Sequence, residues 1–223
     1  MRLEKPCGLS LVEHTARSLR QAIQSGHLKP GSRLVESAIA DEMGISRGPV
    51  REAIQQLAGE GLLEIHPRRG AVVRGLDAKT AYEVQTLRGV LEGFAARLCA
   101  DRLSEQRADA LRRQLQTLMS AAEAGDVAAF VEADVAFHGS IVDFADHHRL
   151  SLAFHALNPL HGVACNFGLS PGEALITSSH RQRRLLAALL SGDAGLAEAM
   201  VMSHYEEQAN LFMSRLSGRR TIH

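Results

Sequence analysis

The sequence predicts a mainly α-helical protein, with a helix-turn-helix and a small β-ribbon in its first third and an antiparallel all-helical bundle in the rest. Three observations carry this prediction. Residues 34–51 contain two segments of helical periodicity that are joined at a glycine. Two short strand-like segments around a turn follow them. From residue 78 onward, long alanine- and leucine-rich segments show hardly any strand signals.

Two helices are expected before the turn of the helix-turn-helix. The first covers residues 10–25 and ends at Gly26. The second starts near residue 34, and its apolar residues recur at helical spacing, which predicts a buried stripe. The stripe residues are Val35, Ala38, Ile39 and Met43. Gly44 then permits the left-handed backbone that a sharp helix end requires.

The helix after this turn is expected to start at Ser46, whose hydroxyl suits an N-cap, and to continue through Glu60. Its leading turn carries Arg47 and Arg51. Arginine is the commonest specific reader of guanine in the major groove, and a helix N-terminus favours nearby phosphate. The pattern therefore suits a recognition helix, although two solvated arginines on an ordinary helical hairpin would look the same. Its predicted buried side consists of Val50, Ile54 and Leu57.

A basic ribbon follows this helix. The segments LLEIH and AVVR flank the turn PRRG, so Arg68 and Arg69 lie at the predicted tip. A helix-turn-helix followed by such a ribbon describes a winged-helix DNA-binding domain, whose ribbon lies over the adjacent backbone or minor groove. The combination is far more specific than any of its parts.

Residues 8–75 resemble the DNA-binding domain of the GntR family of bacterial transcription regulators. The resemblance rests on AIQSGHLKPGSRL, GISRGPVREAI and LAGEGLLEIHPRRGAVV, in that order and spacing. It implies a set of operator contacts on the recognition helix and at the wing tip: Ser46, Arg47, Gly48, Arg51, Arg68, Arg69 and Gly70. The family often has threonine at the position of Gly48. The glycine removes one possible phosphate or base contact, so it affects which operator sequence is recognised and not the mode of binding.

Composition and charge fit a DNA-binding protein of the cytoplasm. The 223 residues contain no run of roughly 18 apolar residues and no signal-peptide core at the N-terminus, so we expect a cytoplasmic location without a membrane partner. The cysteines Cys7, Cys99 and Cys165 are widely separated and form no CxxC pair, which argues against a disulfide framework or a thiolate zinc knuckle. Residues 1–76 hold 11 Lys and Arg against 8 Asp and Glu, whereas residues 77–223 hold 14 against 17. The basic excess thus lies in the predicted DNA reader.

The second part of the chain, residues 78–217, is expected to be the bundle. Helices are predicted over residues 78–100, 104–124, 126–144, 150–166, 178–191 and 193–216, with residues 168–177 as a loop. The predicted N-caps are Asp77, Ser104, Asp126 and Asp193. This part is similar to the FCD effector domain of the FadR-like subgroup of the GntR family, through LRGVLEGFAARLCA, DVAFH and LLAALLSGDAGLAEAMVMSH. The resemblance implies an effector-binding and dimerisation domain.

Asp134 and His138 are the first candidate metal ligands. They stand four residues apart on the apolar side of a predicted helix, so both face inward. A buried carboxylate requires a cation or many hydrogen bonds, and a metal ion satisfies both side chains. A salt-bridged Asp–His pair is the alternative. On the last helix His204 is expected on the inner stripe, together with Leu196, Met200 and Leu211.

The resemblance places Asp134, His138 and His204 at three of the four ligand positions of metal-binding FCD domains. The fourth position falls on Gln182, and His180 lies two residues earlier. A shift in the start of this helix would bring His180 to the fourth ligand position. Otherwise the ion has three protein ligands, or Gln182 acts as a weak oxygen ligand or binds the effector. The expected cofactor is a divalent ion, zinc first, with nickel and manganese as alternatives.

Arg88 is the candidate effector-binding residue, together with Gln182 and His180. It lies in line with inward-facing apolar positions, where it either pairs with Glu92 or receives the carboxylate of an organic acid. The remaining histidines of the bundle lack consistent spacing and are interpreted as surface or capping residues: His147, His148, His155 and His161.

Three functions are therefore weighed. The first is a homodimeric repressor that binds an inverted-repeat DNA operator and responds to a small carboxylate, anchored by the metal, in the bundle. The second is a metal-dependent hydrolase, against which stand the lack of an HExxH pattern and of a well-placed general base. The third is a constitutive DNA binder with a structural metal.

Overall fold

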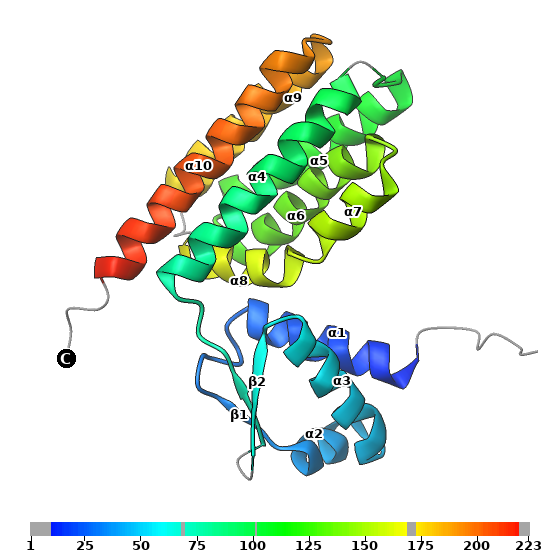
Figure 1. Cartoon of the computed structure of the whole chain (residues 1–223), viewed down its shortest axis with the longest axis vertical. Coiled ribbons are helices and arrows are strands. Elements are labelled where there is room, and N and C mark those ends of the chain that lie inside the picture. The colour runs from blue at the N-terminus through cyan, green and yellow to red at the C-terminus, as the bar shows by residue number, and fades with distance from the viewer. Residues whose placement is uncertain (1–9, 68–69, 101, 169–172, 219–223) are drawn as a thin grey trace, which may run out of the picture. The chain divides into compact units, whose positions relative to one another are not determined.

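A computed structural model describes residues 10–67, 70–100, 102–168 and 173–218, and the chain divides into two compact units, Met1–Gly75 and Leu76–His223 (Figure 1). In the first unit, helix α1 (Leu11–Gln24) begins at Ser10. The Ser10 hydroxyl accepts a hydrogen bond from the Glu13 amide, and the Glu13 carboxylate accepts one from the Ser10 amide. This capping box fixes the start of α1 close to the predicted residue.

The helix-turn-helix consists of α2 (Glu36–Met43) and α3 (Arg47–Gly59). Gly44 ends α2 with a φ of 65°, as predicted. The predicted stripe on α2 is wrong, because Val35 precedes the helix with 46% of its surface exposed and Ala40 is the buried residue. Ser46 is the N-cap of α3 by position, but its hydroxyl makes no capping hydrogen bond.

The described strands form a three-stranded antiparallel sheet in the order β1-β3-β2. The wing is the pair β2 (Leu63–His66) and β3 (Gly70–Val73), in which His66 is opposite Gly70. The short strand β1 (Arg33–Leu34), which the sequence did not predict, pairs with β3. Gly70 has a φ of 79°, a conformation that favours glycine at the end of the tip. The predicted tip residues Arg68 and Arg69 lie outside the described residues.

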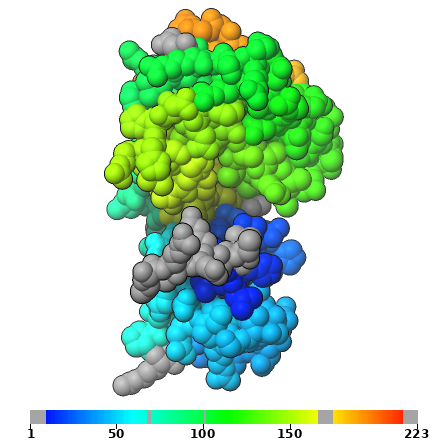
Figure 2. Space-filling view, turned by 90° about the vertical axis from the view of Figure 1, so that its right-hand side faces the viewer, coloured from blue at the N-terminus to red at the C-terminus, as the bar shows by residue number. Residues whose placement is uncertain are grey.

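The second unit is an all-helical bundle. Its helices are α4 (Ala78–Ala100), α5 (Glu105–Ala124), α6 (Val127–Phe144), α7 (His148–His155), α8 (Asn158–Gly168), α9 (Glu173–Leu190) and α10 (Ala194–Gly218). Helices α4 and α10 pack side by side (Figure 1), while α7 lies at the surface on the side shown in Figure 2. Four predicted caps accept backbone hydrogen bonds: Asp77, Ser104, Asp126 and Asp193. Among the described helices, none combines the length and apolarity that a membrane crossing requires.

Two predicted boundaries in the bundle are wrong. The single helix expected over residues 150–166 is two helices, α7 and α8, because the ring of Pro159 would clash with the carbonyl of His155 in a continuous helix. The predicted loop over residues 168–177 is helical from Glu173 onward. Leu175 is fully buried there against Leu118 and Phe130, and this packing extends α9 toward its N-terminus. Residues 169–172 lie outside the described part of the chain.

Candidate functional site

The leading turn of α3 presents the predicted DNA-reading residues to solvent. Ser46, Arg47, Gly48 and Arg51 are all exposed. The opposite side of the helix carries Val50, Ile54 and Leu57, each at most 3% exposed, so the apolar spacing of the sequence sets the rotation of α3. The structure therefore brings these four residues together on one accessible face.

Arg51 is held by an ion pair across the helix-turn-helix. Its Nη2 lies 3.0 Å from Oε2 of Glu36, the first residue of α2, and its Nε lies 3.2 Å from the same oxygen. The hydrogen bond to Glu36, and then its charge, raise the pKa of Arg51. Because the Arg51 side chain is 65% exposed, a phosphate or a base edge can compete with this carboxylate.

A surface hollow of about 270 Å³ lies between the recognition helix and the tip end of the wing strands. Arg47 of α3, Glu36 of α2 and Gly70 of β3 line it, together with Arg33 of β1. Sequence reasoning missed Arg33, because the two-residue strand β1 has no periodicity of its own. The sheet places its guanidinium beside Gly70, so Arg33 belongs to the same basic face.

The bundle contains a buried polar cluster centred on Asp134 of α6. Its carboxylate Oδ1 accepts a hydrogen bond of 2.5 Å from Nε2 of Gln182 and lies 3.5 Å from Nε2 of His138. Its other oxygen, Oδ2, lies 3.5 Å from Nε2 of His161. Asp134, His138 and Gln182 are at most 2% exposed, and the helical spacing of the sequence predicted this for Asp134 and His138.

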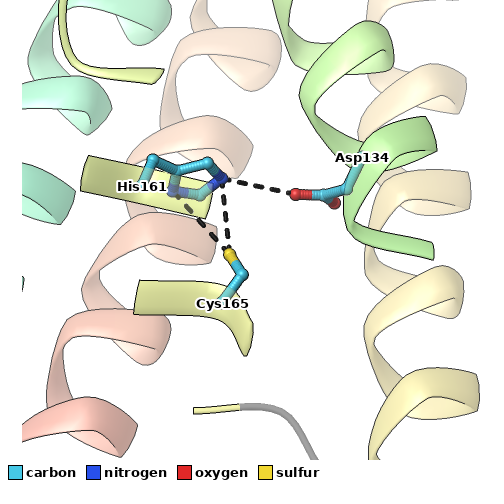
Figure 3. Close-up of side chains that lie close together, drawn as sticks. All are labelled: Asp134, His161 and Cys165. Carbon is cyan, nitrogen blue, oxygen red and sulfur yellow. Dashed lines mark hydrogen bonds and ion pairs between the residues drawn. The ribbon is translucent and has the colours of Figure 1, made fainter. Parts of the chain in front are cut away.

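Helix α8 adds two residues to this cluster that sequence reasoning assigned elsewhere. His161 is fully buried rather than on the surface, and the Cys165 thiol lies 3.5 Å from its Nε2 (Figure 3). The ligand atoms of Asp134, His161 and Cys165 all lie within 4.8 Å of one another. The four-residue spacing of His161 and Cys165 was the available signal. The prediction of one continuous helix over residues 150–166, and the lack of consistent spacing among the histidines, hid it.

Glu92 and Tyr205 hold His138 from the opposite side. Nδ1 of His138 lies 2.6 Å from Oε1 of Glu92, while the Tyr205 hydroxyl donates to Oε2 of Glu92 over 2.7 Å. The expected pairing of Arg88 with Glu92 is therefore wrong. Arg88 donates instead to Oδ1 of Asn158 and to the Tyr205 hydroxyl, because α8 and α10 supply acceptors that the sequence of α4 alone does not reveal.

His204 lies beside the cluster, while His180 does not reach it. The His204 ring stacks on His138 with centroids 5.0 Å apart, and its Nε2 lies 2.9 Å from Nε2 of Gln208. The predicted stripe on α10 is shifted, since Leu196 is 45% exposed and the buried positions include Ala197, Val201 and Tyr205. On α9, His180 is exposed whereas Gln182 is fully buried, because two residues turn a helix by more than half a circle.

The cluster separates the pKa values of its members. Burial opposes the charge of Asp134, but His138 and His161 outweigh it and hold the pKa of Asp134 well below its usual range. Burial likewise opposes protonation of His138, yet Glu92 and Asp134 raise its pKa to about 10. Burial, followed by the charge of Arg88, lowers the pKa of His161 to about 4. Burial, followed by the charge of His138, lowers the pKa of His204 to about 3.

Several buried polar atoms around the cluster lack a hydrogen-bond partner. Within the described part of the chain they include Nε2 of His138, Nη2 of Arg88 and Oε1 of Gln182. Buried polar groups are hydrogen-bonded in the great majority of cases, so a group of such atoms calls for an explanation. A metal ion or a small polar ligand among them would supply the missing partners.

Comparison with known proteins decides the class. Residues 11–73 match the bacterial regulatory proteins of the gntR family, and residues 83–207 match the FCD domain. A "Probable D-xylose utilization operon transcriptional repressor" of Paenarthrobacter nicotinovorans is 34% identical over 182 residues, which cover 82% of this chain and 80% of that protein. The chain belongs to the GntR family. It is a DNA-binding transcriptional regulator, and the hydrolase alternative is wrong.

Two further proteins are similar to this GntR regulator. The gluconate operon transcriptional repressor of Bacillus subtilis is 34% identical over 145 residues, or 65% of this chain and 59% of that protein. The structure of Escherichia coli McbR/YncC superimposes with a TM-score of 0.82 at 24% identity, covering 93% of this chain and 99% of that one. At that identity the superposition supports the fold alone.

Proposed function

We propose that this GntR regulator is a homodimeric repressor that binds an inverted-repeat operator through α3 and the wing. The exposed Arg47 and Arg51 on the leading turn of α3 support this mode, since arginine reads guanine in the major groove. Two relatives are repressors of the D-xylose utilization operon and the gluconate operon, and repression is proposed here by analogy. An operator is reached in the cytoplasm, where we expect the protein to act.

The proposed effector is a small organic acid bound inside the bundle. One observation carries this step: Arg88 is fully buried, and its Nη2 has no hydrogen-bond partner. Its other contacts are to neutral groups, namely Asn158, the Tyr205 hydroxyl and the Phe154 ring, whose centroid lies 4.0 Å from the guanidinium carbon. Arg88 reaches the Glu92 carboxylate only through the Tyr205 hydroxyl, and a bound carboxylate would accept the free donor directly as a charge-assisted hydrogen bond.

A divalent ion at Asp134 is the proposed anchor for that acid. Asp134 faces His138 and Gln182 in the interior, and the unpartnered Nε2 of His138 has the chemistry of a metal ligand. The ligand set that the family resemblance implies also includes His204, whose Nε2 would have to leave Gln208 to bind the ion. Zinc suits these donors, with nickel and manganese as alternatives. The positive charge of the ion would attract the carboxylate toward Arg88 and Gln182.

The test is an operator titration with a panel of small carboxylates, followed by fluorescence anisotropy. We expect at least one carboxylate to weaken operator binding by wild type. The Arg88→Met variant, which keeps the length of the side chain, should bind the operator equally well and lose the response. If no carboxylate changes operator affinity or the melting temperature, the constitutive binder with a structural metal is the better account.

A further inference from the structure

Helix α8 brings a sulfur and a nitrogen donor to the carboxylate of Asp134. The Cys165 Sγ lies 3.5 Å from Nε2 of His161, and that nitrogen lies 3.5 Å from Oδ2 of Asp134 (Figure 3). Tetrahedral zinc, with Zn–S of about 2.3 Å and Zn–N of about 2.0 Å, separates its S and N ligands by about 3.5 Å and its N and O ligands by about 3.3 Å. The two observed separations are close to those around one ion. Because Sγ also lies 3.9 Å from Nδ1 of the same ring, the His161 ring or the thiol has to rotate for both donors to face the ion.

Hydrogen bonds from neighbouring residues orient both histidines toward the Asp134 carboxylate. Nδ1 of His161 lies 3.2 Å from Oε1 of Gln85, and Nδ1 of His138 lies 2.6 Å from Oε1 of Glu92. A histidine whose Nδ1–H is held by an amide or carboxylate oxygen presents its Nε2 to a metal, and this is the usual outer arrangement of metal-bound histidines. The His161 Nε2 lies 3.5 Å from Oδ2 of Asp134, and the His138 Nε2, which has no hydrogen-bond partner, lies 3.5 Å from Oδ1.

The charges of the donors balance a divalent ion. Asp134 contributes one negative charge and a Cys165 thiolate contributes the second, while the His161 imidazole is neutral as a ligand. The assembled site would carry no net charge, which favours its burial in an interior where every member is at most 2% exposed. Sulfur also restricts the choice of ion, since thiolates select zinc-like metals whereas carboxylate-rich sites suit manganese or magnesium.

We propose that Asp134, His161 and Cys165 form a thiolate-containing site for a zinc-class divalent ion, with α8 rather than α10 supplying the ligands beside Asp134 and with His138 next to the site at the other carboxylate oxygen. The inference rests on the proposed metal of the bundle and replaces His204 in its ligand set by His161 and Cys165. One proton leaves the Cys165 thiol for solvent as the sulfur–metal bond forms. His204 then serves as a stacking neighbour of His138 rather than as a ligand.

Cobalt(II) is the probe that tests this site, because a cobalt–thiolate bond gives a sulfur-to-metal charge-transfer absorption in the near ultraviolet. Full-length protein is stripped with chelator, checked by elemental analysis and titrated with cobalt. Wild type should develop the band at one equivalent. Cys99→Ser, which alters the other described buried cysteine, should behave like wild type. Cys165→Ser should lose the band, and His161→Gln should lower cobalt affinity by at least about tenfold.

The outcomes separate the ligand set from the wider function. Absence of the band in cobalt-loaded wild type, or the same band in Cys165→Ser, overturns the thiolate site, and so does a failure of wild type to bind cobalt. Circular dichroism checks that Cys165→Ser is folded, with Cys165→Ala as the second variant. Operator titrations with the carboxylate panel run in parallel. A carboxylate response without the band leaves the proposed function standing, whereas the band without any response contradicts that function alone.

Discussion

Glu36 and Arg51 form an exposed ion pair that links the first residue of α2 to the leading turn of the recognition helix, with Nη2 and Oε2 3.0 Å apart. The operator phosphates must compete with Glu36 for this arginine. We therefore expect Glu36→Gln to tighten operator binding, by less than about tenfold because exposed ion pairs are weak. Titrations at two salt concentrations measure the effect. Weaker binding by Glu36→Gln would show that the carboxylate positions Arg51 for DNA instead of competing with DNA.

Arg47→Ala should weaken operator binding by about 1–3 kcal/mol and relax discrimination at one base pair in each half-site, if Arg47 reads guanine. The measurement is a titration against operators with single base changes. Arg112→Ala is the matched control, since this arginine of α5 pairs with Glu105 and Asp109 on the bundle surface. An Arg47 variant with wild-type affinity and wild-type base preference would remove α3 as the reader.

Metal removal should lower the melting temperature and leave operator binding itself intact. A ligand present at about 1,000 times its dissociation constant stabilises the folded state by about 4 kcal/mol, and chelation removes this contribution. The DNA-binding unit has its own core around Val50, Ala53 and Leu57 and should keep its operator affinity. Differential scanning fluorimetry with and without chelator, followed by re-addition of zinc, tests this. A melting temperature that is indifferent to both treatments contradicts a bound ion.

The stability of chelator-treated protein should be greatest near pH 6.5. Burial and the charge of His138 lower the pKa of His204 to about 3. Below pH 6.5 the unfolded chain therefore binds a proton that the folded protein does not, and the folded state becomes less stable as the pH is lowered. The pKa of His138 rises to about 10 against its burial, through Glu92 and Asp134. The contribution of His138 to the stability of the folded protein is complete below pH 6.5 and is lost as the pH rises toward 10.

Thermal melts from pH 5 to 9 measure both limbs of this profile. His204→Gln should make the acid limb shallower without changing the alkaline one, and the remaining slope comes from His161, whose pKa is lowered to about 4 by burial and the charge of Arg88. Glu92→Gln should weaken the alkaline limb. A profile of His204→Gln that parallels wild type below pH 6.5 would mean that His204 is already charged in the folded protein.

Local periodicity predicted which side of each helix is buried better than it predicted the contacts between helices in the buried cluster. The apolar spacing around Phe137 and Ile141 correctly placed Asp134 and His138 inside, because a single helix determines which side is buried. It did not reveal His161, whose partner Gln85 lies 76 residues away in sequence. It also paired Arg88 with Glu92, the nearest acid on α4. In the folded chain Asn158 and Tyr205 reach Arg88 from other helices.

The central claim is that a metal-anchored acid in the bundle controls DNA binding. Its most direct test is an operator titration of zinc-loaded and chelator-treated protein, each with and without the active carboxylate, for wild type and a His138→Ala, His204→Ala double variant. The account predicts that all forms bind operator without the acid and that only zinc-loaded wild type responds to it. An equal response from the chelator-treated protein and from the double variant would contradict the claim.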